Sequence, residues 1–136
     1  DCIPILLVDE SRRAVAAVHA GWRGTAARIA ARAVDAMRLR FGSRPEDLHA
    51  AIGPGIGPCC YEVGAEVAAQ FGIEGRAHLD LPAINRAQLE EIGIRDSRIY
   101  VSSLCTMCRE EFYSFRRDKQ AAGRMHSFVG IRQAVQ

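Results

Sequence analysis

Cys2 and His19 are the first residues whose types could do chemistry together. Cys2 precedes an apolar run over residues 3–8, and His19 follows a second apolar run over 14–18, with a short polar turn between the runs. This pattern predicts two strands of a hairpin, whose opposed ends are neighbours in space. A thiolate and an imidazole at one sheet edge could bind zinc or act as a nucleophile with its base. The alternative is a buried cysteine and a histidine without a chemical role.

The segment after His19 contains the only tryptophan of the chain beside an arginine. Its sequence, HAGWRGT, predicts a strand end that turns through two glycines into a helix. Free N–H groups at the helix start, together with Arg23, could bind an anion. The alternative is an ordinary turn in which Trp22 fills the core.

The chain has five cysteines, and their odd number does not suit a disulfide framework. Cys105 and Cys108 form a CxxC motif, but a structural zinc site needs a second pair of ligands. The adjacent Cys59 and Cys60 have the wrong spacing to chelate in the same manner. We therefore expect reduced, buried thiols without a metal.

Aromatic and basic residues alternate over 112–118 and again near Arg124. These side chains could stack on a planar base and hold a phosphate, whereas the alternative is a strand with its aromatic residues turned inward. Eighteen Lys and Arg against 16 Asp and Glu give a net charge of +2. This charge is too small to attract nucleic acid or an anionic membrane, so it favours a small anionic or nucleoside-like ligand.

The 136 residues support one domain of mixed architecture. The longest apolar run is too short to span a bilayer and no leader precedes it, which favours a cytoplasmic protein. Strands paired as hairpins and mixed with separate helices indicate the α+β class with a mixed sheet. The expected helices are 25–39, 64–71 and 84–92, the further strands are 48–52, 78–81, 99–102 and 127–131, and a loop rich in Gly and Pro covers 53–60.

Six ordered motifs resemble the YfiH-type laccase-domain family: DCIPILL, HAGWRGT, IGPGIGPCCYEVG, DLPAINRAQL, CTMC and FYSFRRDKQAAGRMHSF. The resemblance implies a four-layer α/β/β/α sandwich with mixed sheets. It also implies that residues 1–136, a single domain that begins without Met, form the C-terminal portion of a larger domain, incomplete at the N-terminus.

The resemblance further implies a zinc-dependent purine nucleoside phosphorylase that acts on adenosine and inosine, with adenosine deaminase as a side activity. Of the family's His-Cys-His metal site, the second and third ligands correspond to Cys2 and His19, and the first would lie upstream. A zinc ion with an open position lowers the pKa of bound water to about 7, and the resulting hydroxide could attack C6 of adenine.

The predicted catalytic residues are Cys2, His19 and Arg23, with Arg23 also a candidate for binding phosphate. Arg117 and Arg124 are further phosphate candidates, because phosphorolysis needs cations that orient the phosphate at the ribose. Tyr61, at the end of the Gly-Pro loop, could stack on base or sugar. The expected partners are thus a purine nucleoside and phosphate, and the sequence does not fix the oligomeric state.

Three other functions are open at this point. A copper-dependent polyphenol oxidase is disfavoured, because multicopper oxidation needs many histidines and this chain has four at scattered positions. A Cys-His hydrolase or deamidase would use Cys2 as its nucleophile. A catalytically incomplete fragment could bind nucleosides without turnover.

Overall fold

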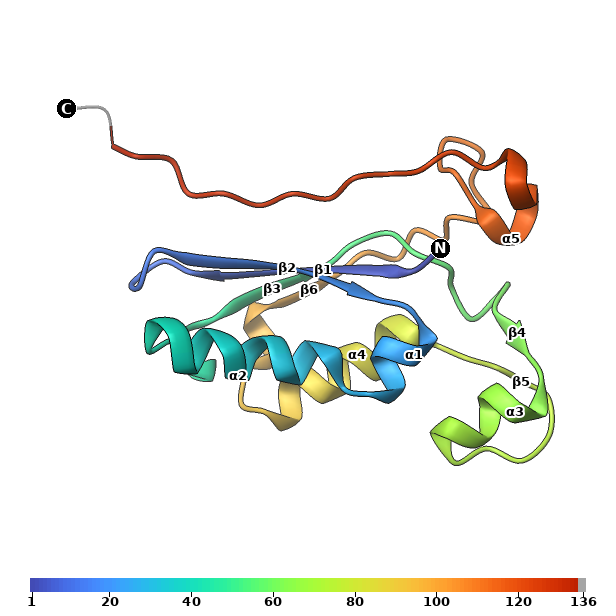
Figure 1. Ribbon diagram of the computed structural model, residues 1–136, viewed down its shortest axis with the longest axis horizontal. Coiled ribbons are helices and arrows are strands. Elements are labelled where there is room, and N and C mark those ends of the chain that lie inside the picture. The colour runs from blue at the N-terminus through green and yellow to red at the C-terminus, as the bar shows by residue number, and fades with distance from the viewer. Residues whose placement is uncertain (135–136) are drawn as a thin grey trace.

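A four-stranded mixed sheet organises the computed structural model, which describes residues 1–134 (Figure 1). Its strand order is β2-β1-β3-β6, with β1 antiparallel to both neighbours and β3 parallel to β6. A separate antiparallel pair is formed by β4 and β5. The strands are β1 (Ile3–Asp9), β2 (Ala14–Ala20), β3 (His49–Ile52), β4 (Glu62–Val63), β5 (Ala77–His78) and β6 (Ile99–Val101).

Helices cover one face of the sheet, and the C-terminal segment runs across the other (Figure 1). The covering helices are α1 (Trp22–Ala26), α2 (Ile29–Phe41) and α4 (Leu81–Glu91), while α3 (Ala65–Ala68) and α5 (Phe115–Asp118) lie toward the end of the sheet at which β1 begins. Single 3-10 turns complete the described helices: η1 (Pro45–Asp47), η2 (Ala69–Phe71), η3 (Asp96–Arg98) and η4 (Lys119–Ala121).

Alternation along β1 shows why the helices pack on one face only. Ile3, Ile5 and Leu7 are fully buried, whereas the intervening Leu6 and Val8 are only partly buried. Successive strand residues point to opposite faces, so the first three contribute to the core beneath the helices. Each buried side chain of this kind stabilises the fold by about 1.5–3 kcal/mol.

The single helix predicted over residues 25–39 is wrong, because the chain forms two helices there. α1 already begins at Trp22, and Arg28 takes a left-handed conformation with φ 56° between α1 and α2. The carbonyl of Thr25 accepts hydrogen bonds from the Arg28 N–H and from the Gln88 side chain, 3.0 and 2.9 Å long. This second bond, made by a distant residue, is not visible in helical periodicity.

Other elements also differ from the sequence predictions. The strand expected over 78–81 covers Ala77–His78, and Asp80 instead caps α4 by accepting a 3.0 Å hydrogen bond from the Ala83 N–H. α4 therefore begins at Leu81 rather than at residue 84. Residues 127–131 lie in the segment over the open sheet face and do not pair as a strand within the described chain.

The α+β class with a mixed sheet is confirmed. Of the four layers expected from the resemblance, residues 1–134 supply one layer of helices and one four-stranded sheet. Among these residues no helix has the length and apolar character needed to cross a membrane.

Candidate functional site

Cys2 and His19 come together at one end of the β1 and β2 pair. Pro4 lies opposite His19 and Ile3 opposite Ala20, so Cys2 is the diagonal neighbour of His19 on the face away from the buried Ile3. Diagonal partners on one face are within reach of long side chains. Both residues are solvent-exposed. The hairpin thus places the thiol and the imidazole at one sheet edge, while their binding of a metal stays a prediction.

Gly21 makes room for the Cys2 side chain. A Cβ atom on Gly21 would lie 3.0 Å from Cys2 Sγ, closer than ordinary van der Waals contact. A larger residue at this position would therefore push the Cys2 thiol aside.

Arg23 projects from α1 beside the same strand end. Its guanidinium carbon lies 4.4 Å from the centre of the Trp22 ring, in cation–π geometry. Trp22 is partly buried and packs against the core, whereas Arg23 is exposed. The indole therefore anchors a cation at the edge that carries Cys2 and His19.

A buried polar contact between α1 and α4 holds this segment in place. The Asn85 side chain donates hydrogen bonds to the Thr25 hydroxyl, 3.0 Å away, and to the Leu81 carbonyl, 2.9 Å away. Gln88, one turn further, donates to the Thr25 carbonyl. Thr25 and Asn85 are fully buried, so these bonds form where water cannot replace them. Sequence analysis missed this role of the DLPAINRAQL motif, since residues 60 positions apart give no local signal.

Tyr61 and Arg116 form a second aromatic and basic pair. The Arg116 guanidinium lies 5.0 Å from the Tyr61 ring centre and donates a 2.8 Å hydrogen bond to the Glu62 carbonyl. Burial raises the pKa of Tyr61, the positive charges of Arg116 and Arg23 oppose the rise, and Cys2 adds to it. The pKa of Tyr61 therefore depends on residues near both ends of the chain. Arg116 was missed as a site residue, although it stands in the alternating aromatic and basic tail.

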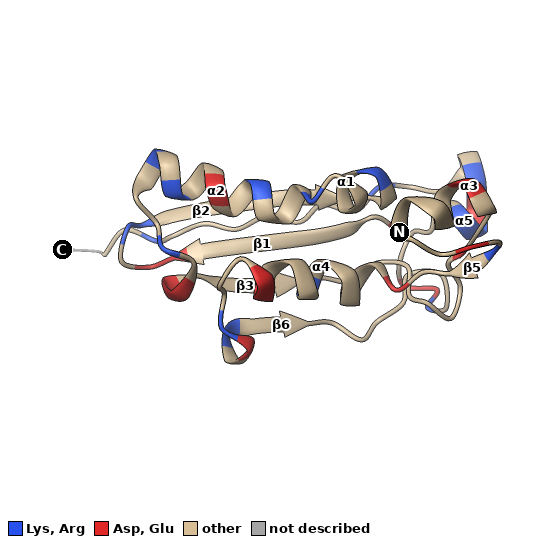
Figure 2. Ribbon diagram, turned by 90° about the horizontal axis from the view of Figure 1, so that it is seen from below, with Lys and Arg blue, Asp and Glu red and all other residues tan. Residues whose placement is uncertain are grey.

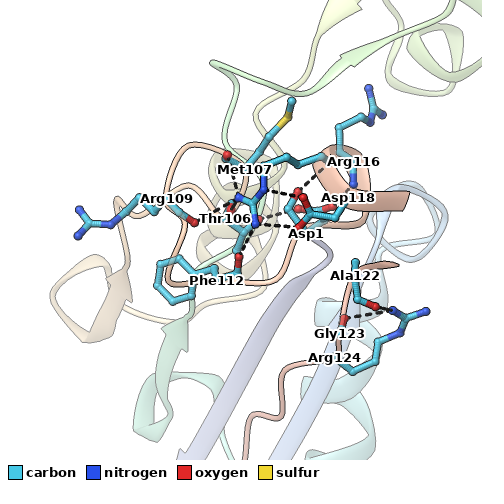
Figure 3. A network of polar contacts seen from close by, with 12 residues as sticks. Asp1, Thr106, Met107, Arg109, Phe112, Arg116, Asp118, Ala122, Gly123 and Arg124 are labelled. Atoms are coloured by element: carbon cyan, nitrogen blue, oxygen red, sulfur yellow. Dashed lines mark hydrogen bonds and ion pairs between the residues drawn. The ribbon is translucent and has the colours of Figure 1, made fainter. Parts of the chain in front are cut away.

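Asp1 connects the three segments around this corner (Figure 3). Its carboxylate accepts a 2.7 Å hydrogen bond from the Thr106 hydroxyl and another of 2.7 Å from the Arg116 N–H. Its carbonyl accepts from the Ile56 N–H at 2.8 Å. Asp1, which directly precedes Cys2, thereby holds the Gly-Pro loop, the CxxC turn and α5 against the start of β1.

Arg117 forms its polar contacts within its own loop. Its guanidinium makes two 2.9 Å contacts with the Asp118 carboxylate. Its remaining N–H groups donate to main-chain carbonyls, those of Thr106, Met107, Arg109 and Phe112. Since each of its five N–H groups has an acceptor, phosphate binding by Arg117 would require this network to open.

Arg124 lies apart from the Asp1 network (Figure 3). One guanidinium nitrogen donates to the carbonyls of Ala122 and Gly123, both at 3.1 Å, and the residue is exposed. On α2, one acidic residue, Asp35, lies among the basic residues Arg32, Arg38 and Arg40 (Figure 2).

The expectation of buried, separate thiols is wrong for most of the cysteines. The sulfur atoms of Cys59, Cys60, Cys105 and Cys108 all lie within 4.8 Å of one another, so they could hold a metal ion. Only Cys105 of these four is buried, and Cys59 and Cys108 are exposed. Sequence spacing failed here because the second pair of sulfurs comes from a loop 45 or more positions away, joined by tertiary structure.

Neighbouring groups shift the pKa values of these thiols in opposite directions. Burial opposes ionisation of Cys105, but hydrogen bonds from the N–H groups of Gly57, Cys108 and Met107 outweigh it and lower its pKa to about 6. A hydrogen bond with Cys108, together with burial, raises the pKa of Cys60 to about 12. The cluster therefore contains a sulfur prepared to be a thiolate.

The histidines do not form a shared site. His49 pairs with Val8 and His19 with Pro4, so they are separated along β1 by four residues, or about 13 Å. His78 is bonded to the Pro58 carbonyl, 2.6 Å away. Over residues 1–134, the cysteine cluster is the single group of three or more Cys, His or acidic side chains arranged for a metal.

Known proteins resemble this chain over nearly its whole length. A purine nucleoside phosphorylase of Deinococcus radiodurans is 47% identical over 96% of the chain. A protein named adenosine deaminase RL5, from an unknown prokaryotic organism, is 41% identical over 96% of the chain. The chain spans about half the length of these curated relatives, 54% and 55% respectively.

Solved structures show the same arrangement. The crystal structure of YlmD from Geobacillus stearothermophilus matches 90% of the chain with a TM-score of 0.85 and 41% identity, over 51% of that protein. The family model described as multi-copper polyphenol oxidoreductase laccase matches residues 1–132. The expected resemblance is thereby confirmed, and the chain belongs to this laccase-like family.

Proposed function

We propose that the protein carrying this chain is a purine nucleoside phosphorylase that also deaminates adenosine. The names of its relatives support this class of activity. The observation that carries the proposal is the pairing of β1 with β2, which sets Cys2 and His19 on one exposed face beside Arg23. Phosphorolysis needs a group that orients phosphate at the ribose, and deamination needs a group that activates water.

The metal expected at this edge fits the two ligands that the chain offers. Cys2 and His19 are a soft thiolate and an imidazole on one face, a donor set that suits zinc. A zinc ion bound there would supply a Lewis acid. The chain's own contribution is to orient the thiol against Gly21 and the imidazole at the end of β2.

Arg23 and Arg116 are the cations that we assign to the phosphate. The Arg23 guanidinium lies over the Trp22 ring and the Arg116 guanidinium lies over the Tyr61 ring. In each pair the cation is positioned by an aromatic ring, which does not neutralise its charge. Such cations stabilise the negative charge of a phosphate that attacks the anomeric carbon of ribose. Arg117 would then hold its loop in shape, and Arg124 would contribute a further positive charge from the exposed tail. Tyr61 would pack against the base or the sugar.

Product analysis of the full-length protein tests this function. Adenosine and inosine are incubated with and without phosphate, and hypoxanthine, adenine, ribose 1-phosphate and ammonia are quantified. We expect release of free base and ribose 1-phosphate only with phosphate, and release of ammonia from adenosine without it. Absence of all four products would overturn the proposal.

Matched variants assign the residues. Arg23→Ala and Arg116→Ala should each raise the phosphate concentration needed for half-maximal phosphorolysis by about tenfold or more. The reason is that a charge-assisted contact is worth roughly 1.5–3 kcal/mol. His49→Ala, at the opposite end of β1, removes an exposed side chain outside the site and is the control. An unchanged phosphate dependence in both arginine variants would exclude these two residues from phosphate binding.

The other candidate functions are separable in the same samples. A hydrolase that used Cys2 as its nucleophile would be trapped by an electrophile and would keep its turnover after chelation. A polyphenol oxidase would require copper and phenol turnover. Within residues 1–134, His19 and His49 lie too far apart along β1 to form a multicopper ligand set for such an oxidase.

A further inference from the structure

Two loops distant in sequence are joined beside the Cys2 edge by main-chain contacts. Gly55 and Cys105 form a parallel β-bridge, and the Thr106 N–H donates a 3.0 Å hydrogen bond to the Gly55 carbonyl. Asp1 reinforces this junction because it binds both the Ile56 N–H and the Thr106 hydroxyl. The loops are therefore held in register by groups other than the cysteines.

This register brings the four sulfurs to the spacing of a tetrahedral metal site. Cys108 Sγ lies 3.5 Å from Cys59 Sγ and 3.3 Å from Cys60 Sγ, and all four sulfurs lie within 4.8 Å of one another. Zinc binds thiolates at about 2.3 Å, so sulfurs at the corners of its tetrahedron are about 3.8 Å apart. A small adjustment of the exposed side chains would produce that geometry.

Main-chain donors surround one of the sulfurs in the manner of a zinc-binding turn. The Gly57 N–H donates a 3.2 Å hydrogen bond to Cys105 Sγ. The N–H groups of Met107 and Cys108, two and three residues after Cys105, also stabilise its thiolate. Such second-shell donors orient metal-bound sulfur and reduce its charge.

Glycine at position 57 is needed for this approach. A Cβ there would lie 3.3 Å from both Cys59 Sγ and Cys105 Cβ, which is tighter than most real contacts. The Arg117 guanidinium, bonded to the carbonyls of Met107 and Arg109, places a positive charge behind the CxxC turn. Because the Asp118 carboxylate pairs with this guanidinium, Arg117 contributes to the site by fixing the CxxC turn.

We propose that Cys59, Cys60, Cys105 and Cys108 bind one zinc ion as a structural site separate from Cys2 and His19. The ion would cross-link the Gly-Pro loop to the CxxC turn and so fix Tyr61, which follows Cys60 directly. With four protein ligands it has no open position for substrate, so its contribution is to folding. This inference does not depend on the nucleoside reaction.

Cobalt substitution of the full-length protein tests the site directly. The Cys2→Ser variant removes the one cysteine of residues 1–136 that lies outside the cluster. An intense thiolate-to-cobalt charge-transfer absorption that is present in this variant and lost when cluster cysteines are also replaced therefore comes from the four sulfurs. We expect this absorption in Cys2→Ser loaded with Co²⁺, its loss on addition of Zn²⁺, and its absence when Cys60→Ser and Cys108→Ser are added. Absence of the band from Cys2→Ser, or its survival in the triple variant, would overturn the proposal.

Thiol protection gives an answer that needs no variant to fold. The wild-type protein is alkylated with and without Zn²⁺, and each modified cysteine is mapped by mass spectrometry. We expect zinc to slow alkylation of the exposed Cys59 and Cys108 at least tenfold. If Cys59 and Cys108 are each alkylated at the same rate with and without Zn²⁺, the sulfurs do not form this site. A disulfide between the two loops in zinc-loaded protein would show the same.

Discussion

Cys2 Sγ lies 3.0 Å from the position that a Cβ atom of Gly21 would occupy. Gly21→Ala should therefore displace the Cys2 thiol while the sheet remains folded. We expect kcat/KM for inosine to fall about tenfold to a hundredfold, because a displacement of about 1 Å can have an effect of this size. Steady-state assays of the full-length protein measure the change.

Gly130→Ala is the matched control for that substitution, since no atom lies within 4 Å of the added methyl group. It should leave kcat/KM unchanged. Equal activity of the two alanine variants would contradict the role of Gly21 in positioning Cys2.

Asn85→Leu should destabilise the chain by about 1–3 kcal/mol, because it leaves the buried Thr25 hydroxyl without its donor. Urea denaturation measures the free energy of unfolding. Ala87→Leu introduces the same side chain at an exposed position of α4 and should have a small effect. In a double-mutant cycle with Thr25→Val, additive losses would show that the two side chains do not interact.

Arg117→Lys should loosen the CxxC turn although it preserves the charge. A lysine ammonium cannot reach the acceptors that the planar guanidinium binds together, the Asp118 carboxylate and four carbonyls. Hydrogen exchange should accelerate for the amides of residues 106–112. Arg109→Lys, whose side chain is exposed and paired with Glu111, is the control and should leave this exchange near wild type. Identical protection in both variants would refute the role assigned to Arg117.

Asp9 should make stability depend on acid pH. Burial opposes its ionisation, yet hydrogen bonds from the Ser11 hydroxyl and the Arg12 N–H, 2.7 and 3.0 Å long, outweigh this effect and lower its pKa. The folded pKa is below the unfolded one, so its contribution is present above about pH 4 and is lost as pH falls through the folded value. Asp9→Asn should flatten the fall in unfolding free energy between about pH 5 and pH 2.

Glu10→Gln tests whether the effect belongs to the buried carboxylate. Glu10 is the adjacent, exposed residue of the same turn. Its substitution should preserve most of the wild-type slope. A flattening as large as that of Asp9→Asn would show that the slope does not arise from Asp9.

The local patterns of the sequence predicted those features that depend on neighbouring residues. Alternating burial defines β1, and the polar turn between two apolar runs correctly predicts its pairing with β2, which places Cys2 and His19 at the same end of the strand pair. The mixed class follows from the same patterns, because hydrophobic periodicity and turn residues act over a few positions.

Tertiary structure decided the features that join distant segments. Gln88 donates to the Thr25 carbonyl just before the helix break at Arg28, and Arg117 donates to carbonyls of the preceding loop. The sulfur cluster lies where the bridge between Gly55 and Cys105 joins two loops. Each arises from a contact between groups that chain spacing leaves unrelated. The sequence alone thus indicated most of the elements and the hairpin that carries Cys2 and His19, whereas only packing of the loops determined which cysteines meet and which arginines remain exposed.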